Sequence, residues 1–180
     1  PFFAFSATAR MTGMRAAMRG KLGDRSDAGQ NAVADTLAAD IKRIRAFDTT
    51  GLDHATRTSL GVVESAYDVA LAGFALPYGD VAVGGWRNTP YVVIQNVGAY
   101  LDIPRFLDSD HPIRDGADAD AYLSRLEGYA PVLDGETGRL KAAASKGLIA
   151  PAFLIEKAIR QMEQSVSGAQ QGGGLAESIA

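Results

Sequence analysis

The sequence predicts an all-α fold, an irregular multi-helix bundle crossed by one segment rich in proline and aromatic residues, with at most a short hairpin. Three observations predict it. Apolar residues recur every three to four positions along most of the chain, whereas only residues 91–94 have strand character. Proline and glycine punctuate the periodic stretches. A hydrophobic fraction of 47% over 180 residues suffices for one helical region spanning residues 1–180.

In the first half of the chain, helices are predicted over residues 8–22, 30–47 and 52–75. Ser26 is placed to cap the second of these helices and Asp53 the third, because short polar side chains accept hydrogen bonds from the first free backbone N–H groups. Pro77 stops the third helix. The three apolar stripes are Met11, Met14, Ala17 and Met18; Val33, Leu37, Ile41 and Ile44; and Leu60, Val63, Tyr67, Leu71 and Phe74.

In the second half, helices are predicted over residues 117–146 and 151–167. Asp115 or Asp118 caps the first, Pro131 bends or ends it, and Gly147 follows its end as the C′ residue. Pro151 opens the next helix, and residues 175–180 resemble the first turn of another. The last long helix carries a stripe that we expect to be buried: Ile155, Ile159, Met162 and Val166.

Residues 85–113 are the most unusual stretch, since they hold the only tryptophan, two of the six tyrosines and three of the seven prolines. Pro90, Pro104 and Pro112 are expected to interrupt regular structure. Residues 91–94 could form one short strand that pairs with residues 81–83. We expect the segment from Trp86 to Phe106 to pack over the helices, with part of the surface of Trp86, Tyr91, Tyr100 and Phe106 facing missing polypeptide, a partner subunit or a substrate channel.

Composition excludes several classes of protein. The net charge of −3 gives no basic surface for nucleic acid, and the longest apolar runs fall far short of the ~20 residues that span a bilayer. Because cysteine is absent, the chain has neither disulfides nor thiolate metal sites. The arginines between Arg10 and Arg25 are interpreted as a solvated helix face in preference to a phosphate site.

Candidate catalytic groups are few. His54 is expected to be exposed in the first turn of a helix. His111 follows Asp108 and Asp110, a string that allows a metal site but is more typical of a structural turn. Neither HExxH nor GxSxG occurs, and the glycines at 172–174 are interpreted as a loop and not a phosphate cradle. Four carboxylates are interpreted as exposed surface charge: Asp118, Asp120, Glu127 and Asp134. No catalytic residue and no metal ligand is therefore predicted within this chain.

The sequence of this proline-rich stretch and of the residues that follow it resembles that of a known protein family. PYVVIQNVGAYLDIPRFLDSDHPI is followed by an acidic spacer and then by AYLSRLEGYAPVLDGETGRLKAAASKGLIAPAFLIEKAIRQME. In this order the segments resemble the N-terminal half of the bacterial family known as domain of unknown function 885. The resemblance implies a much longer, mostly helical, zinc metallopeptidase-like protein whose His-Glu-x-x-Pro-Gly-His-like element lies further along. That element is absent here, so no zinc ligand can be assigned.

The resemblance implies that this chain is the N-terminal helical part of a zinc-dependent peptidase-like hydrolase and forms one wall of its substrate channel. Its partners would be the remainder of the same polypeptide and a peptide substrate, its zinc would be bound elsewhere in the parent protein, and its location would be periplasmic or secreted, with the cytoplasm as the alternative. The alternative function is a non-catalytic helical binding or scaffold module. The candidate substrate-binding residues are Trp86, Arg87, Asn88, Tyr91 and Gln95.

Overall fold

The structure is a computed structural model that describes residues 18–83 and 88–179. These residues form an all-α fold, as predicted. Within the two described ranges the only β pairing is two isolated bridges, Asp80 with Thr89 and Ile94 with Val97. The helices are α3 (Asp27–Arg45), α4 (His54–Phe74), α5 (Ala99–Ser109), α6 (Gly116–Glu127), α7 (Tyr129–Ser145), α8 (Ala152–Gln170) and the short 3₁₀ helix η2 (Gly174–Ile179).

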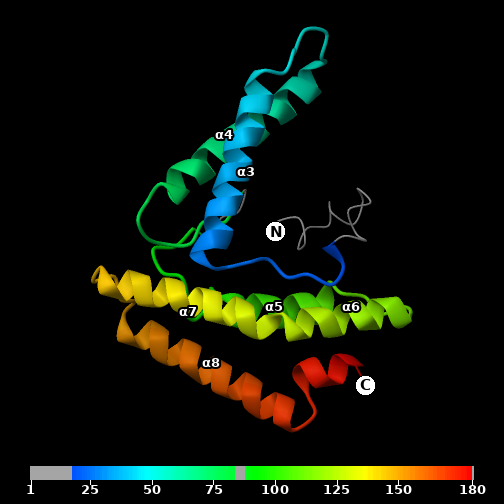
Figure 1. Ribbon diagram of the computed structural model, residues 1–180, viewed down its shortest axis with the longest axis vertical. Helices are drawn as coiled ribbons and strands as arrows, with labels where there is room; N and C mark the ends of the chain where they lie inside the picture. Colours follow the sequence, from blue (N-terminus) through cyan, green and yellow to red (C-terminus); the bar gives the residue numbers. More distant parts are fainter. Residues whose placement is uncertain (1–17, 84–87, 180) are drawn as a thin grey trace.

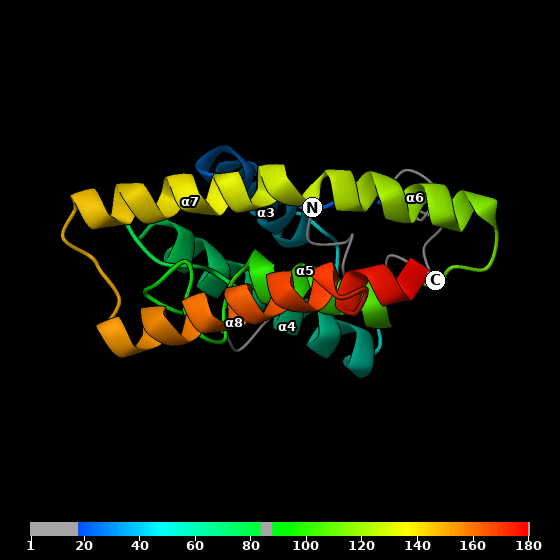
Figure 2. The same ribbon diagram turned by 90° about the horizontal axis from the view of Figure 1, so that it is seen from below.

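The helices form two parts (Figure 1). The antiparallel pair α3 and α4 projects from a base that is built of α5, α6 and α7. Figure 2 shows α6 and α7 following one another along nearly one line, with α8 running back in the opposite direction on the other side of the base. The helix η2 follows α8 and packs against α5 and α8. None of the described helices has the length and apolar character needed to cross a membrane.

The three predicted N-caps are confirmed. The Ser26 hydroxyl accepts from Gly29 N at 3.2 Å. The Asp53 and Asp115 carboxylates accept from Thr56 N and Asp118 N, each at 2.8 Å. Each cap fixes a helix start, and the starts of α3, α4 and α6 fall within three residues of those predicted.

The predicted break in the long helix over residues 117–146 lies at Gly128, three residues before Pro131. Proline cannot donate to the carbonyl four residues earlier, which here belongs to Glu127, and its ring crowds that carbonyl. The chain therefore ends α6 at Glu127 and restarts as α7, with Pro131 in the first turn, where its missing N–H costs nothing. At the other end, Gly147 has a φ of +80° and Leu148 N donates to Ala143 O, as expected of a C′ glycine.

One prediction in the proline-rich block is wrong, because Pro104 lies inside α5 and does not interrupt it. A proline at this position leaves the carbonyl of Tyr100 without its helical donor. The Tyr129 hydroxyl lies 3.4 Å from that carbonyl oxygen and replaces the donor. Burial raises the pKa of Tyr129 to about 12, which keeps the hydroxyl protonated. Tertiary packing therefore compensates the local cost of the proline.

Other boundaries also differ from prediction. Residues 91–94 do not form a strand and do not pair with residues 81–83: Asp80 pairs with Thr89 through hydrogen bonds of 2.8 and 3.2 Å, and Ile94 pairs only with Val97 across a tight turn. Pro151 is the N-cap of α8 and not its first residue, and η2 replaces the α-helical turn expected near the end. Most of the helix predicted over residues 8–22 lies outside the described residues.

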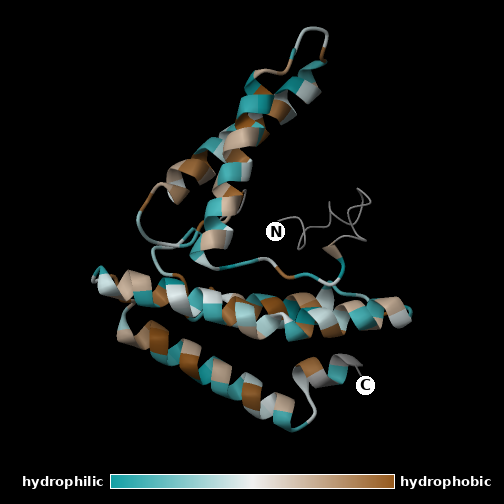
Figure 3. Cartoon of the chain, in the orientation of Figure 1, coloured by the Kyte–Doolittle hydropathy of each residue, from teal (hydrophilic) through white to brown (hydrophobic). Residues whose placement is uncertain are grey.

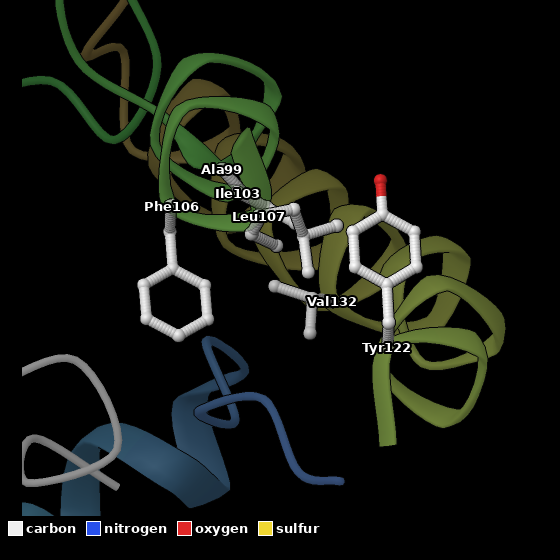
Figure 4. Packing of buried hydrophobic residues seen from close by; sticks show 6 residues of the cluster. All are labelled: Ala99, Ile103, Phe106, Leu107, Tyr122 and Val132. Atoms are coloured by element: carbon white, nitrogen blue, oxygen red, sulfur yellow. The ribbon is translucent and has the colours of Figure 1, made fainter. Parts of the chain in front are cut away.

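The main core lies between α5, α6 and α7 (Figure 4). Ala99 and Ile103 are fully buried, and Phe106, Leu107, Tyr122 and Val132 converge on the same space. A second, smaller cluster of Leu37, Ala70 and Val83 holds α3 against α4. In Figure 3 the apolar residues of α8 form a broad stripe, yet only Ala158 of this helix is buried. The prediction that Ile159 is buried is therefore wrong, since 47% of it is exposed.

This difference in burial generates a stability prediction. Ile103→Ala should lower the free energy of unfolding by about 2–5 kcal/mol, because it leaves a void in a closed core. Ile159→Ala, which removes half-exposed methylenes, should cost about 1 kcal/mol or less. Urea denaturation of both variants measures the two values, and equal midpoints would contradict the assigned faces of α5 and α8.

Candidate functional site

A buried carboxylate, Glu136 of α7, lies against the first turn of α5. Its Oε1 and Oε2 atoms accept from Ala99 N at 3.0 and 2.9 Å. Only 2% of Glu136 is exposed. The chain enters α5 through Gly98, whose φ of +138° is rarely adopted by residues with a side chain. A carboxylate at a helix N-terminus is stabilised by the helix dipole and by the free N–H groups.

Arg25 connects this carboxylate to the segment that precedes α3. Its Nη1 donates to Glu136 Oε1 at 2.9 Å, and its Nη2 donates to Asp102 Oδ2 of α5 at 2.7 Å. Arg139, one turn after Glu136, extends the network: it pairs with Asp80 at 2.9 Å and donates to Gly79 O at 2.8 Å. The network thus joins α5, α7, the segment before α3 and the loop after α4.

Burial raises the pKa of Glu136, and the Arg25 guanidinium and the Ala99 N–H oppose that rise. Burial alone would lower the pKa of Arg25, but the Glu136 and Asp102 carboxylates outweigh it and the pKa is raised. The Glu136 oxygens accept from Arg25 Nη1 and from Ala99 N, and both partners are donors, which fits the ionised carboxylate.

A second buried cluster surrounds His111 at the other end of the base. His111 Nε2 lies 2.9 Å from the carbonyl oxygen of Asp118, and the Arg125 Nη1 atom contacts His111 Nδ1. Arg125 also donates to Met18 O at 3.0 Å and to Lys21 O at 3.2 Å. Arg19 in turn donates from Nε to Asp118 Oδ1 at 3.0 Å. These bonds hold the segment before α3 against α6.

The contacts of His111 determine its tautomer. The Asp118 carbonyl can only accept and the guanidinium can only donate, so Nε2 carries the proton and Nδ1 accepts. The neutral ring also packs edge-on against Tyr122 at 5.4 Å. Burial lowers the pKa of His111, and Arg125 lowers it further against the opposing effect of the Asp118 carbonyl. Burial lowers the pKa of Arg125 to about 10.

Both clusters are satisfied internally. No buried side-chain nitrogen or oxygen lacks a hydrogen-bond partner in the described ranges. Nor do these residues contain a group of three or more His, Cys, Asp or Glu side chains that could hold a metal ion. Zinc therefore does not fit the residues described, and the interpretation of His111 as part of a turn is favoured over the metal interpretation. The two ionic clusters hold separate segments of the chain against one another.

The best candidate for binding is an apolar cavity of about 390 Å³ between α7, α8 and residues 90–93. Pro90, Tyr91, Val92 and Val93 form one wall. The other walls are formed by Leu140 and nearby α7 residues, by residues 148–150 and by α8. Its volume and apolar lining are within the range found for small-molecule sites.

The structure separates the predicted site residues. Tyr91 lines this cavity and is half-buried. Asn88 lines a different hollow beside α4, and its Oδ1 accepts from Ala82 N at 2.8 Å. Gln95 lies in the turn closed between Ile94 and Val97, and Trp86 and Arg87 lie outside the described residues. Tyr100 and Phe106 are core residues of α5.

Sequence reasoning missed the buried ionic residues. Arg19 and Arg25 pair with Asp118 and Glu136 and do not lie on a solvated face. Asp118, which was expected to be exposed, is only 3% exposed. Glu136 was not singled out. A signal did exist, since Gly135 precedes it within a helix: a Cβ at Gly135 would lie 2.9 Å from Ser26 N. A glycine inside a helix therefore indicated a close approach of another segment.

Removing the Glu136 carboxylate should destabilise the chain strongly. Glu136→Ala leaves both Arg25 and the Ala99 N–H without their main acceptor, so the free energy of unfolding should fall by about 3–5 kcal/mol. Glu156→Ala, an exposed carboxylate of α8, is the matched control and should change it by about 0.5 kcal/mol or less. Similar losses in both variants would refute the anchoring role of Glu136.

The neutral His111 makes stability depend on pH. Because its pKa in the folded chain is below the ordinary value of 6.5, its contribution is complete above pH 6.5 and is lost as the pH falls through the lowered value. His111→Gln keeps a donor for Asp118 O and an acceptor for Arg125 but does not titrate. Below pH 6.5 the wild type should therefore lose stability more steeply than this variant, by up to about 1.4 kcal/mol per pH unit. Parallel curves of unfolding free energy against pH would contradict the lowered pKa of His111.

Comparison with known proteins supports the family resemblance that the order of motifs indicated. Residues 7–180 match the model of a bacterial protein family of unknown function, DUF885. No curated protein and no solved structure was found to match. Because the match covers nearly all of the sequence, the chain belongs to the DUF885 family.

Proposed function

We propose that this chain is the N-terminal helical part of a zinc-dependent, peptidase-like hydrolase and forms one wall of its substrate channel. The observation that carries the proposal is the apolar cavity beneath residues 90–93, which adjoins the proline-rich segment. An apolar cavity beside a segment without regular secondary structure suits a peptide, because the cavity can receive an apolar side chain while polar groups of the segment hold the main chain.

The zinc site belongs to the parent protein in this proposal. The residues described here supply no group of three ligands, so the metal would be bound by the remainder of the polypeptide, and no chemical step is assigned to this chain. Its share is to bind and orient the substrate. Tyr91 is the central contact, since it lines the cavity. Trp86, Arg87, Asn88 and Gln95 stay proposed substrate-binding residues, with Asn88 beside a separate hollow at α4. The proposed location is the periplasm or the cell exterior.

A non-catalytic binding module is the second candidate function. The observation that favours it is the exposed apolar face of α4, where Val62 and Val69 are each more than 60% exposed beside a hollow of about 570 Å³. Exposed apolar surface of this kind often marks a contact surface. Zinc content of the longest polypeptide encoded by the gene separates the two, since a scaffold needs no stoichiometric metal.

Substitution of the cavity wall tests the first candidate. In the zinc-loaded parent enzyme, Tyr91→Ala should lower kcat/KM for peptides at least about fivefold, because an apolar contact to the substrate is lost, while the zinc content stays unchanged. Tyr78→Ala is the control, as Tyr78 is exposed and lies outside this cavity. Unchanged kcat/KM in Tyr91→Ala, with the fold intact, would reduce this wall to packing alone.

A further inference from the structure

The apolar cavity between α7 and α8 has one charged residue among those that line it, Lys141 of α7. The remaining lining is aliphatic or aromatic and includes Leu140, Leu148, Ile155 and Met162. A cavity of about 390 Å³ with a single cation at its edge has the chemistry of a site for a molecule with an apolar body and one negative end.

Lys141 differs from the basic side chains that hold the base together. Arg19, Arg25, Arg125 and Arg139 are all engaged with carboxylates or carbonyls, and Lys146 donates to Pro77 O at 2.9 Å. Lys141 is exposed, and among the described residues no hydrogen bond or ion pair holds its ammonium. A lysine can lay its hydrocarbon stem along an apolar wall while its ammonium stays in water.

We propose that this cavity binds a monocarboxylate with an apolar body, with the carboxylate on Lys141 and the hydrocarbon between α7, α8 and Tyr91. One cation matches one negative charge, whereas a phosphate dianion calls for more donors than the lining offers. In a peptide this chemistry occurs at the C-terminus when the last residue is apolar. Assigning the ligand to a peptide C-terminus rests on the proposed function; the binding of a free monocarboxylate does not.

The test uses the 180-residue chain with isotope-labelled Ile, Leu and Met methyl groups, observed by NMR. Decanoate and a tripeptide ending in leucine are the two probes, and decanamide and the C-terminal amide of the tripeptide are their uncharged counterparts. Binding should shift the methyl signals of Ile155 and Met162, and not that of the core residue Ile103. Each carboxylate should bind more tightly than its amide.

Three variants identify the residues. Lys141→Met keeps the stem and removes the charge, so it should weaken decanoate binding about fivefold and leave decanamide unchanged. Lys157→Met, a change of the same kind on the exposed side of α8, should have no effect. Ala144→Leu places a larger side chain in the lining of the cavity and should weaken both probes.

Equal affinity for decanoate and decanamide, or unchanged decanoate binding in Lys141→Met, would overturn the proposal, as would the absence of methyl shifts with every probe. Binding of decanoate without the tripeptide would support the site and overturn its assignment to a peptide. None of these measurements depends on zinc, so a parent protein without zinc would refute the proposed hydrolase and leave this result standing.

Discussion

The fold depends on a single buried carboxylate at the N-terminus of α5. Glu136 satisfies the Ala99 N–H, and its charge is balanced by Arg25 from a segment more than a hundred residues earlier. A buried ion pair adds little net stability compared with apolar packing, but removing one partner is costly. The pair therefore acts mainly by excluding other arrangements, since a different docking of α5 on α7 would leave a charge buried alone. It fixes how the base is assembled.

The same interaction determines how the projecting pair of helices is attached. Ser26, directly after Arg25, is the N-cap of α3, and Gly135 allows the backbone of Ser26 to lie against α7. The end of the pair is held by Arg139, which binds Gly79 O and Asp80. Both connections of α3 and α4 to the base therefore end on one turn of α7. Lys146 adds another link between the two parts, because its Nζ donates to Pro77 O at 2.9 Å.

The sequence predicted elements whose cause is local and missed those whose cause is distant. Ser26, Asp53 and Gly147 act on neighbouring backbone groups, and their helix ends were predicted closely. Pro104 was misinterpreted because its tolerance depends on Tyr129, 25 residues later. Asp118 and Glu136 were missed for a related reason. A charged residue on a helix is usually solvated, and only a partner far away in the sequence makes its burial favourable.

For the candidate site, the sequence predicted the apolar residues but not how much of them is exposed. Periodicity identified the apolar face of α8, but half of Ile159 remains exposed because α8 does not pack closely on α7. Tyr100 connects α5 to α8, since its hydroxyl lies 2.7 Å from Gln161 Oε1 and 3.0 Å from Ile94 O. Residues 90–93 close one side of the space between α7 and α8. The buried charges of the chain fix how its helices are arranged, whereas the apolar residues between α7 and α8 leave a space that a ligand could fill.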